Sequence, residues 1–286
     1  MKTLRQTILF LALLLPATLL QAQTPDYLGD CRKALDEGKC KKAETLYKLA
    51  HKKDKEIERR IAECKGGSSG QENRGETSLV GDANGHEWVD LGLPSGTLWA
   101  TCNVGASKPE GYGNYYAWGE TSTKRTYNWE SYGYVQGTTL EDPRLTKYCN
   151  KSHFGNNGFT DNLTELQGSD DPATAWGSGW RTPSKAQWEE LMDNTTHKWT
   201  TQNGTNGRLF TSEKNGQTLF LPAAGGRWDS EFRKTGSYGF YWSRSLVTDV
   251  PSIAYFLDFY PTECYMFCGS RDTGLSVRPV TLKSKG

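Results

Sequence analysis

The chain carries almost no net charge and few of the residue patterns on which enzymes and metal sites depend. Its 34 Lys and Arg nearly balance 33 Asp and Glu, so the formal net charge is +1. This balance gives no reason to expect nucleic acid or an anionic membrane as a partner. The four histidines are scattered, without the spacing of metal ligands. The glycine-rich stretch at 66–70 lacks the Lys-Ser/Thr of a phosphate-binding loop. We therefore expect no catalytic residue, no metal and no cofactor.

Long apolar runs are missing after residue 20. The run from Ile8 to Leu20 follows Lys2 and Arg5 and ends before Gln21-Ala22, a small-residue cleavage site. These features are typical of a secretory signal peptide over residues 1–22, and the run is too short to favour a membrane span. We expect an exported protein, in the periplasm, on the cell surface or in the medium, with no integral membrane segment in the mature chain.

Residues 26–64 contain no Trp or Pro, and their apolar residues recur at helical spacing. Three such groups predict three amphipathic helices: Leu28, Cys31 and Leu35; Ala43, Tyr47 and Ala50; Ile57, Ile61 and Cys64. The small residues of the second group resemble those of a tetratricopeptide repeat. A lone repeat buries little apolar surface, so a disulfide between Cys31 and Cys64 is an attractive staple, with Cys40 as another partner. We interpret residues 24–65 as a helical module, either a docking or self-association element or a spacer.

The sequence then changes in character. Residues 66–83 are rich in Gly, Ser and charge and predict a flexible linker. Residues 84–281 hold all ten Trp and are rich in Gly and Tyr, which favours a turn-rich, aromatic-packed α+β domain. Seven cysteines in an exported chain allow disulfides but leave at least one thiol over, and Cys102 with Cys149 is the best pair in this domain.

Two local signals predict elements of the large domain. Val89, Leu91 and Leu93 alternate with polar residues before the turn Pro94-Ser95-Gly96, which indicates a hairpin. Gly179 to Leu191 reads as a helix, with Thr182 as its cap and Pro183 at its first position.

The stretch from Gly239 to Val280 carries the functional prediction. If Ile253 to Tyr260 is a strand, Tyr255, Leu257 and Phe259 share one face, which is apolar enough for a core. Phe256, Asp258 and Tyr260 share the other face. An unpaired carboxylate is costly to bury, so we expect this second face to point to water. Two large aromatics on such a face favour a docked ligand over an ordinary sheet edge.

A turn at Pro261-Thr262-Glu263 would bring two further aromatics back onto that face. We expect five central ligand-binding residues, Phe256, Asp258, Tyr260, Tyr265 and Phe267. Weaker candidates for the rim are Arg244, Val247, Asp249 and Asp272.

Three stretches together resemble a known family: Val89-Asp90-Leu91-Gly92-Leu93-Pro94-Ser95-Gly96-Thr97-Leu98-Trp99-Ala100, the Gly179–Leu191 helix, and Ser276-Val277-Arg278-Pro279-Val280. They are similar to the Fibrobacter succinogenes major paralogous domain over about residues 84 to 280. That family is similar in turn to the formylglycine-generating-enzyme branch of the C-type lectin fold. The resemblance implies a compact α+β domain with few helices and short, twisted antiparallel strands.

The same resemblance bears on function. Some proteins of this fold are the variable proteins of diversity-generating retroelements, which present a changing C-terminal binding surface, here matched by Tyr241 to Val280. Formylglycine-generating enzymes instead hold copper with a late cysteine pair, and Cys264 and Cys268 fall in that region. Their spacing is one residue short of that pair, and the Arg-Gly-Gly-Ser-Trp stretch is absent. The Glu-Pro-Asn, Gln-Pro-Asp and Trp-Asn-Asp motifs of calcium-dependent lectins are absent too.

We therefore expect a non-enzymatic protein that binds a protein or glycan ligand. The alternatives are a structural or adhesin-type assembly subunit that docks through residues 24–65 and, more remotely, a copper oxidase.

Overall fold

The computed structural model describes residues 27–36, 43, 47, 50, 54–66, 80–136 and 143–283. The chain divides into two compact units, Met1–Glu76 and Thr77–Gly286. The predicted signal peptide lies outside the described residues, as does most of the predicted linker. The last four residues of that linker are the strand β1, Val80–Ala83, so the prediction of a linker up to residue 83 was wrong at this end. None of the helices described in the structure is both long and apolar enough to cross a membrane.

The N-terminal unit contains α1 (Tyr27–Asp36) and α3 (Lys55–Gly66). Asp54 caps α3, accepting bonds from the backbone N–H groups of Glu56 and Ile57 at 3.0 and 3.2 Å. The residues with helical spacing meet in one apolar cluster, formed by Cys31, Ala34, Leu35, Ala43, Ile57 and Ile61. The helical periodicity was therefore read correctly, although most of the predicted middle helix lies outside the described residues.

The thiols do not pair as expected. Cys31 is free, and its Sγ donates to the carbonyl of Ala43 at 3.2 Å; the Cys40 and Cys64 side chains lie outside the described residues. Cys102 and Cys149 are free as well, so the predicted bridge between them was wrong. Cys149 lies inside an aromatic cluster and donates to the carbonyl of Lys151, whereas Cys102 follows a different strand, beside Thr101.

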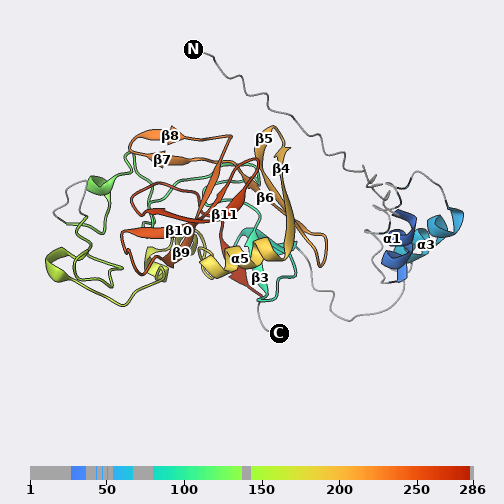
Figure 1. Cartoon of the computed structure of the whole chain (residues 1–286), viewed down its shortest axis with the longest axis horizontal. Coiled ribbons are helices and arrows are strands. Elements are labelled where there is room, and N and C mark those ends of the chain that lie inside the picture. Colours follow the sequence, from blue (N-terminus) through green and yellow to red (C-terminus); the bar gives the residue numbers. More distant parts are fainter. Residues whose placement is uncertain are drawn as a thin grey trace, which may run out of the picture. The chain divides into compact units, whose positions relative to one another are not determined.

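The C-terminal unit is an α+β structure of small antiparallel sheets, as the sequence predicted (Figure 1). One sheet has the order β1-β2-β3-β12 and pairs the start of the unit with its end. Its other strands are β2 (His86–Asp90), β3 (Thr97–Ala100) and β12 (Val280–Leu282). The predicted hairpin is confirmed, because β2 and β3 are antiparallel and the N–H of Gly96 donates to the carbonyl of Leu93.

The remaining strands form three more sheets. A meander joins β4 (Thr195–Gln202), β5 (Thr205–Ser212) and β6 (Thr218–Pro222). A short hairpin joins β7 (Gly226–Trp228) and β8 (Glu231–Arg233). The last sheet, in the order β11-β10-β9, contains β9 (Gly239–Leu246), β10 (Ile253–Phe259) and β11 (Cys264–Ser270).

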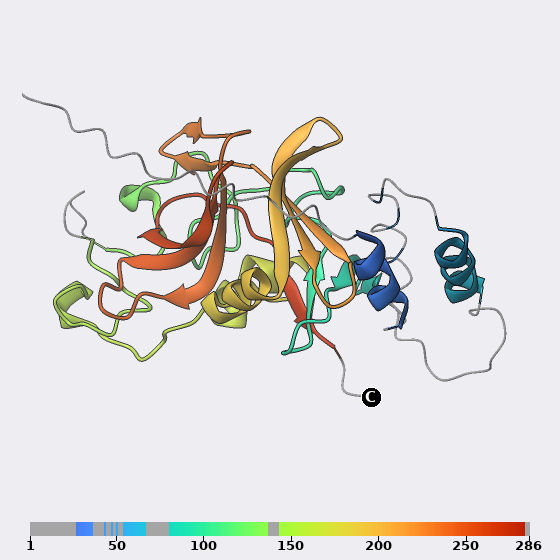
Figure 2. The ribbon, with the colours of Figure 1, turned by 45° about the vertical axis from the view of Figure 1, so that its right-hand side comes forward.

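Two α-helices precede the meander, α4 (Pro172–Trp176) and α5 (Lys185–Asp193). The cap of α5 is Ser184 rather than the predicted Thr182. Ser184 and Gln187 form a reciprocal capping box, while Thr182 is buried and bonded to the Asp171 carboxylate. In both views α5 lies beside the β9–β11 sheet (Figures 1 and 2). Its Trp188 and Leu191 join Leu257 and Phe259 in the largest apolar cluster.

The described part of the long segment before α4, residues 101–136 and 143–171, has no extended strand but is not merely a surface loop. It includes the short 3-10 helices Trp129–Ser131, Asn156–Gly158 and Gly168–Asp170. Leu145 and Tyr148 in it are fully buried, and Leu166 nearly so. Trp118, Tyr148 and Leu166 share one apolar cluster with Trp242, Leu246 and Ala254, and so close one half of the second face of the β9–β11 sheet, the face of Phe256 and Asp258. The other half of that face carries the candidate site.

Candidate binding surface

The predicted hairpin between β10 and β11 is confirmed. Tyr260 and Glu263 exchange backbone hydrogen bonds around Pro261 and Thr262, at 3.1 and 3.3 Å. The register places Phe267 opposite Phe256 and Tyr265 opposite Asp258. Residues directly opposite in a sheet point to the same face, so the return strand adds its aromatics to those of β10, as the sequence predicted.

Two further rings from β9 and the residue before it complete the surface. Phe240 lies opposite Asp258 on β9, and Tyr238 stacks on Phe240 with ring centroids 5.6 Å apart. We call the resulting set the aromatic face: Tyr238, Phe240, Phe256, Asp258, Tyr260, Tyr265 and Phe267. Sequence reasoning missed Tyr238 and Phe240, although their alternation with Trp242 was a usable signal.

The rings of the aromatic face form a continuous chain of contacts. Ring centroids are 5.0 Å apart for Tyr238 and Tyr260, 6.4 Å for Tyr260 and Tyr265, and 6.1 Å for Tyr265 and Phe267. The last two pairs are nearly perpendicular, at 88° and 83°. Such edge-to-face pairs are favoured because the positive ring edge meets the negative ring face. The rings therefore hold one another in place.

Exposure across the aromatic face differs from the prediction. Phe256 and Asp258 are each only 8% exposed, so the expectation that they point freely to water was wrong. The reason is that β10 is the central strand, covered by side chains from both neighbours. The edge strand β11 is open instead, with Tyr265 37% and Phe267 52% exposed, and Tyr260 is half-buried.

The opposite face of β10 behaves as predicted at two of three positions. Leu257 and Phe259 are fully buried. Phe259 lies over Gly239, where a Cβ would sit 2.1 Å from the ring, so only glycine fits there. Tyr255 is half-buried at the border, where the ammonium of Lys185 lies 5.4 Å from its ring.

Asp258 is the chemically unusual residue of the aromatic face. Its Oδ1 is shielded from solvent and has no hydrogen-bond partner, and its Oδ2 accepts only a long 3.4 Å bond from the Tyr265 hydroxyl. Burial raises the pKa of this carboxyl to about 6, against a weaker lowering by the Tyr265 bond. Burial and the nearby Asp258 carboxylate in turn raise the pKa of Tyr265 to about 12.

Three other buried carboxylates in the same unit have cations beside them. Asp170 pairs with Lys147 at 2.6 Å, Asp171 with Arg181 at 3.3 Å and Asp90 with Lys283 at 3.0 Å. Among the described residues, no Lys or Arg forms an ion pair with Asp258. The aromatic face thus holds a buried acid whose charge nothing described in the chain neutralises.

The four rim candidates do not join the aromatic face. Val247 and Asp249 lie in the connection between β9 and β10, at the end of the sheet away from the turn at 260–263. Asp272 follows β11 at that same far end and is buried, accepting a bond from Ser270, so its assignment to an exposed rim was wrong. Burial raises its pKa.

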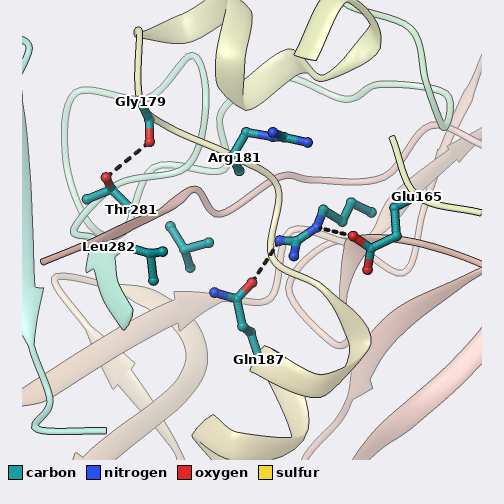
Figure 3. A pocket seen from close by; sticks show the side chains of 8 residues that line it. Glu165, Gly179, Arg181, Gln187, Thr281 and Leu282 are labelled. Carbon is teal, nitrogen blue, oxygen red and sulfur yellow. Dashed lines mark hydrogen bonds and ion pairs between the residues drawn. The ribbon is translucent and has the colours of Figure 1, made fainter. Parts of the chain in front are cut away.

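Arg244 lines a separate polar pocket (Figure 3). The register of β9 against β10 shifts between Ala254 and Phe256, and Arg244 lies within the irregular part of β9. Its guanidinium donates to Glu165 at 2.9 Å and to Gln187 at 2.8 Å. The pocket has a volume of about 400 Å³ and is lined by Glu165, Gly179, Arg181, Gln187, Arg244, Val280, Thr281 and Leu282. Its charges are already neutralised, because Arg244 pairs with Glu165 and Arg181 with Asp171.

Arg208 supports the turn that carries Tyr260. It is 4% exposed, and its Nη2 donates to the carbonyls of Tyr260 and Glu263 at 2.6 and 2.9 Å. Its Nη1 lies 2.9 Å from Nδ1 of His197, which must then be an acceptor. Burial and the Arg208 charge lower the pKa of His197, in keeping with a neutral ring.

Cys264 and Cys268 do not come together. Both lie on β11, four residues apart in an extended strand, so their Cα atoms are separated by ~13 Å. One metal ion between two thiolates needs sulfur ligands at about 2.3 Å. Burial also raises the pKa of the Cys264 thiol to about 12, which keeps it protonated at neutral pH.

Within the described part of the chain, no three His, Cys, Asp or Glu side chains are grouped so that they could hold a metal ion. Comparison with known proteins finds no matching family model, no matching curated protein and no matching solved structure.

Proposed function

We propose that this chain is an exported, non-enzymatic ligand-binding protein that uses the aromatic face of its C-terminal unit. One observation carries the proposal: six aromatic side chains on three neighbouring strands or directly beside them share one face with a single carboxylate, and the two on the edge strand are exposed. Exposed aromatics supported by a rigid sheet give a large contact area at little cost in side-chain entropy, which suits a binding surface. A protein or a glycan is the ligand class we propose.

The scaffold we propose is the C-type lectin fold. The small antiparallel sheets, the few short helices and the long irregular segment packed into the core are in keeping with that proposal. Non-enzymatic function is supported by the thiol geometry, since a copper oxidase of this type needs its cysteine pair at one metal ion, and Cys264 and Cys268 are separated along β11.

The test is the double substitution Tyr260→Ala with Phe267→Ala in the mature chain. A glycan and protein array with the wild type first identifies a ligand. We expect the double variant to lose binding at least a hundredfold. Its free energy of unfolding should fall by no more than about 2 kcal/mol, because Phe267 is 52% exposed and Tyr260 half-buried.

Phe232→Ala is the matched control. Phe232 is 61% exposed on β8, outside the aromatic face, so its loss removes a comparable exposed ring. Equal loss of binding in Phe232→Ala would place the ligand elsewhere. A large loss of stability in the double variant would show that Tyr260 and Phe267 are structural residues.

A further inference from the structure

We infer that the aromatic face recognises a positively charged side chain, lysine or arginine, presented by a protein partner, with Asp258 as the group that neutralises its charge. This inference rests on the proposed binding function and names the chemistry of its ligand.

The first argument is the arrangement of the neighbours of Asp258. In a sheet each residue has four nearest neighbours on its own face, two along the strand and two across it. For Asp258 all four are aromatic. Along the chain they are Phe256, two residues before it, and Tyr260, two residues after it. Across the sheet they are Phe240 on β9 and Tyr265 on β11. Ring faces attract cations, and none of these four side chains brings a positive charge to the carboxylate.

The second argument is the missing partner. Oδ1 of Asp258 accepts no hydrogen bond, and Oδ2 accepts only the 3.4 Å bond from Tyr265. A buried carboxylate normally has a cation or several donors, as Asp170 and Asp171 do here. A guanidinium or ammonium group would supply both the charge and the donors that Asp258 lacks.

The third argument is a cation already held in this way by the same unit. The guanidinium of Arg271 lies 4.9 Å from the Trp118 ring, 5.3 Å from Tyr132 and 5.7 Å from Tyr148. The aromatic face repeats this surrounding of rings and adds a carboxylate, but among the described residues no Lys or Arg pairs with Asp258. Lys234 reaches only the outer ring of the face, with its ammonium 4.9 Å from the ring of Tyr238.

Exposure favours a macromolecular source of the cation. Tyr265 and Phe267 lie open on the edge strand at 37% and 52% exposure, so the approach to Asp258 is across a surface. A long basic side chain can reach over such a surface while the rest of its protein packs on Phe267. Tyr265 lies at the entrance, because its hydroxyl is the donor that an incoming cation would replace.

The experiment is a titration of the full mature chain followed by the aromatic NMR signals of Tyr260, Tyr265 and Phe267. The probes are N-acetyl-arginine methylamide and N-acetyl-lysine methylamide, each compared with the same blocked derivative of an uncharged side chain, citrulline or Nε-acetyl-lysine. We expect the basic probes to bind at least tenfold more tightly than the neutral ones. Asp258→Asn should remove that difference, whereas Asp249→Asn, which deletes an exposed acid of the same unit, should keep it.

Acidification and a second variant test the inference without relying on Asp258→Asn. Tyr265→Phe keeps the ring but removes the competing hydroxyl, so it should bind the basic probes at least as tightly as the wild type. Affinity for them should also rise between pH 5 and pH 7, as Asp258 loses its proton. The titratable groups that face Asp258 are the phenols of Tyr265 on β11 and of Tyr260 after β10, while Phe240 on β9 adds none.

Three outcomes would overturn the inference: equal binding of charged and neutral probes, no binding of the basic probes at 50 mM, or tighter binding of choline, a small quaternary ammonium ion, than of either amino-acid probe. The proposed function fails separately. If a ligand from the array requires Tyr260 and Phe267 but binds Asp258→Asn as tightly as the wild type, the proposed binding surface stands. Only the inference that this surface recognises a cation is then refuted.

Discussion

The face of the β9–β11 sheet that bears Phe256 and Asp258 has two halves, and each half holds a charged side chain among aromatic rings. The two charges have opposite signs, and only one of them has a full set of hydrogen-bond partners. In the closed half, Arg271 is fully buried, and its guanidinium donates to the carbonyls of Lys147, Tyr148 and Pro251. In the open half, Asp258 has one long hydrogen bond and an oxygen without a partner.

The difference separates a structural charge from a functional one. Aromatic rings attract a cation, and carbonyl oxygens accept its hydrogen bonds. Arg271 therefore links the irregular segment before α4 to the end of β11. The rings around Asp258 bring no positive charge to it, and nothing described near Asp258 compensates for its burial. A residue that destabilises the free protein in this way is a candidate for a role in ligand binding.

Removing the satisfied charge should have the largest effect. Arg271→Ala leaves the carbonyls of Lys147, Tyr148 and Pro251 without their donor and empties the space under Trp118. We expect the free energy of unfolding to fall by at least about 3 kcal/mol, measured by urea denaturation. Arg125→Ala, which removes an exposed arginine, should change it by less than about 0.5 kcal/mol. If the free energy of unfolding falls by a comparable amount in both variants, the hydrogen bonds and ring contacts of Arg271 contribute nothing to stability.

Much of this arrangement could be predicted from the sequence because it depends on periodicity and turns. The alternation in Ile253 to Tyr260 and the turn at Pro261-Thr262-Glu263 were enough to place Tyr265 and Phe267 on the face of Phe256 and Asp258, though not to give the register. Both are local features, and the strand period of two then assigns each residue to a face.

What could not be predicted depends on contacts between distant segments. Whether β10 is central or at an edge is decided by β9, and that order determines that Asp258 is buried. The shift in register that separates Arg244 from the aromatic face is an irregularity of pairing with no clear mark in the sequence. Arg271 was overlooked because its partners, Trp118, Tyr132 and Tyr148, are more than a hundred residues away.

Removing the unsatisfied charge should have the opposite sign and a smaller size. Burial raises the pKa of Asp258 from 3.8 to about 6 in the folded protein. The folded state therefore holds this proton more tightly than the unfolded chain, and its stability falls as pH rises from about 4 to 6. Two pKa units correspond to about 3 kcal/mol, so we expect Asp258→Asn to be more stable than the wild type by about 1–3 kcal/mol at pH 7.

The pH dependence is the sharper half of that prediction. Below about pH 4 both side chains are neutral, so the advantage of Asp258→Asn should vanish there. Urea denaturation of both proteins at pH 4, 5.5 and 7 measures it. A variant that is less stable at pH 7 would mean that Asp258 is satisfied in the native protein, and the contrast with Arg271 would be lost.

Arg208 is the intermediate case and should give the smallest effect. It is buried, with Nε unpartnered, yet its Nη2 holds the carbonyls of Tyr260 and Glu263 in the turn. Arg208→Met keeps the apolar stem, removes the unpartnered Nε, and leaves the carbonyls of an exposed turn that water can reach, so these contributions nearly cancel. We expect a loss of about 1 kcal/mol, with faster amide hydrogen exchange at Tyr260 and Glu263, while Lys198→Met, an exposed change on β4, leaves both unchanged. Unchanged exchange in Arg208→Met would show that the aromatic rings alone hold the turn in position, and Arg208 would then belong with neither half of the sheet.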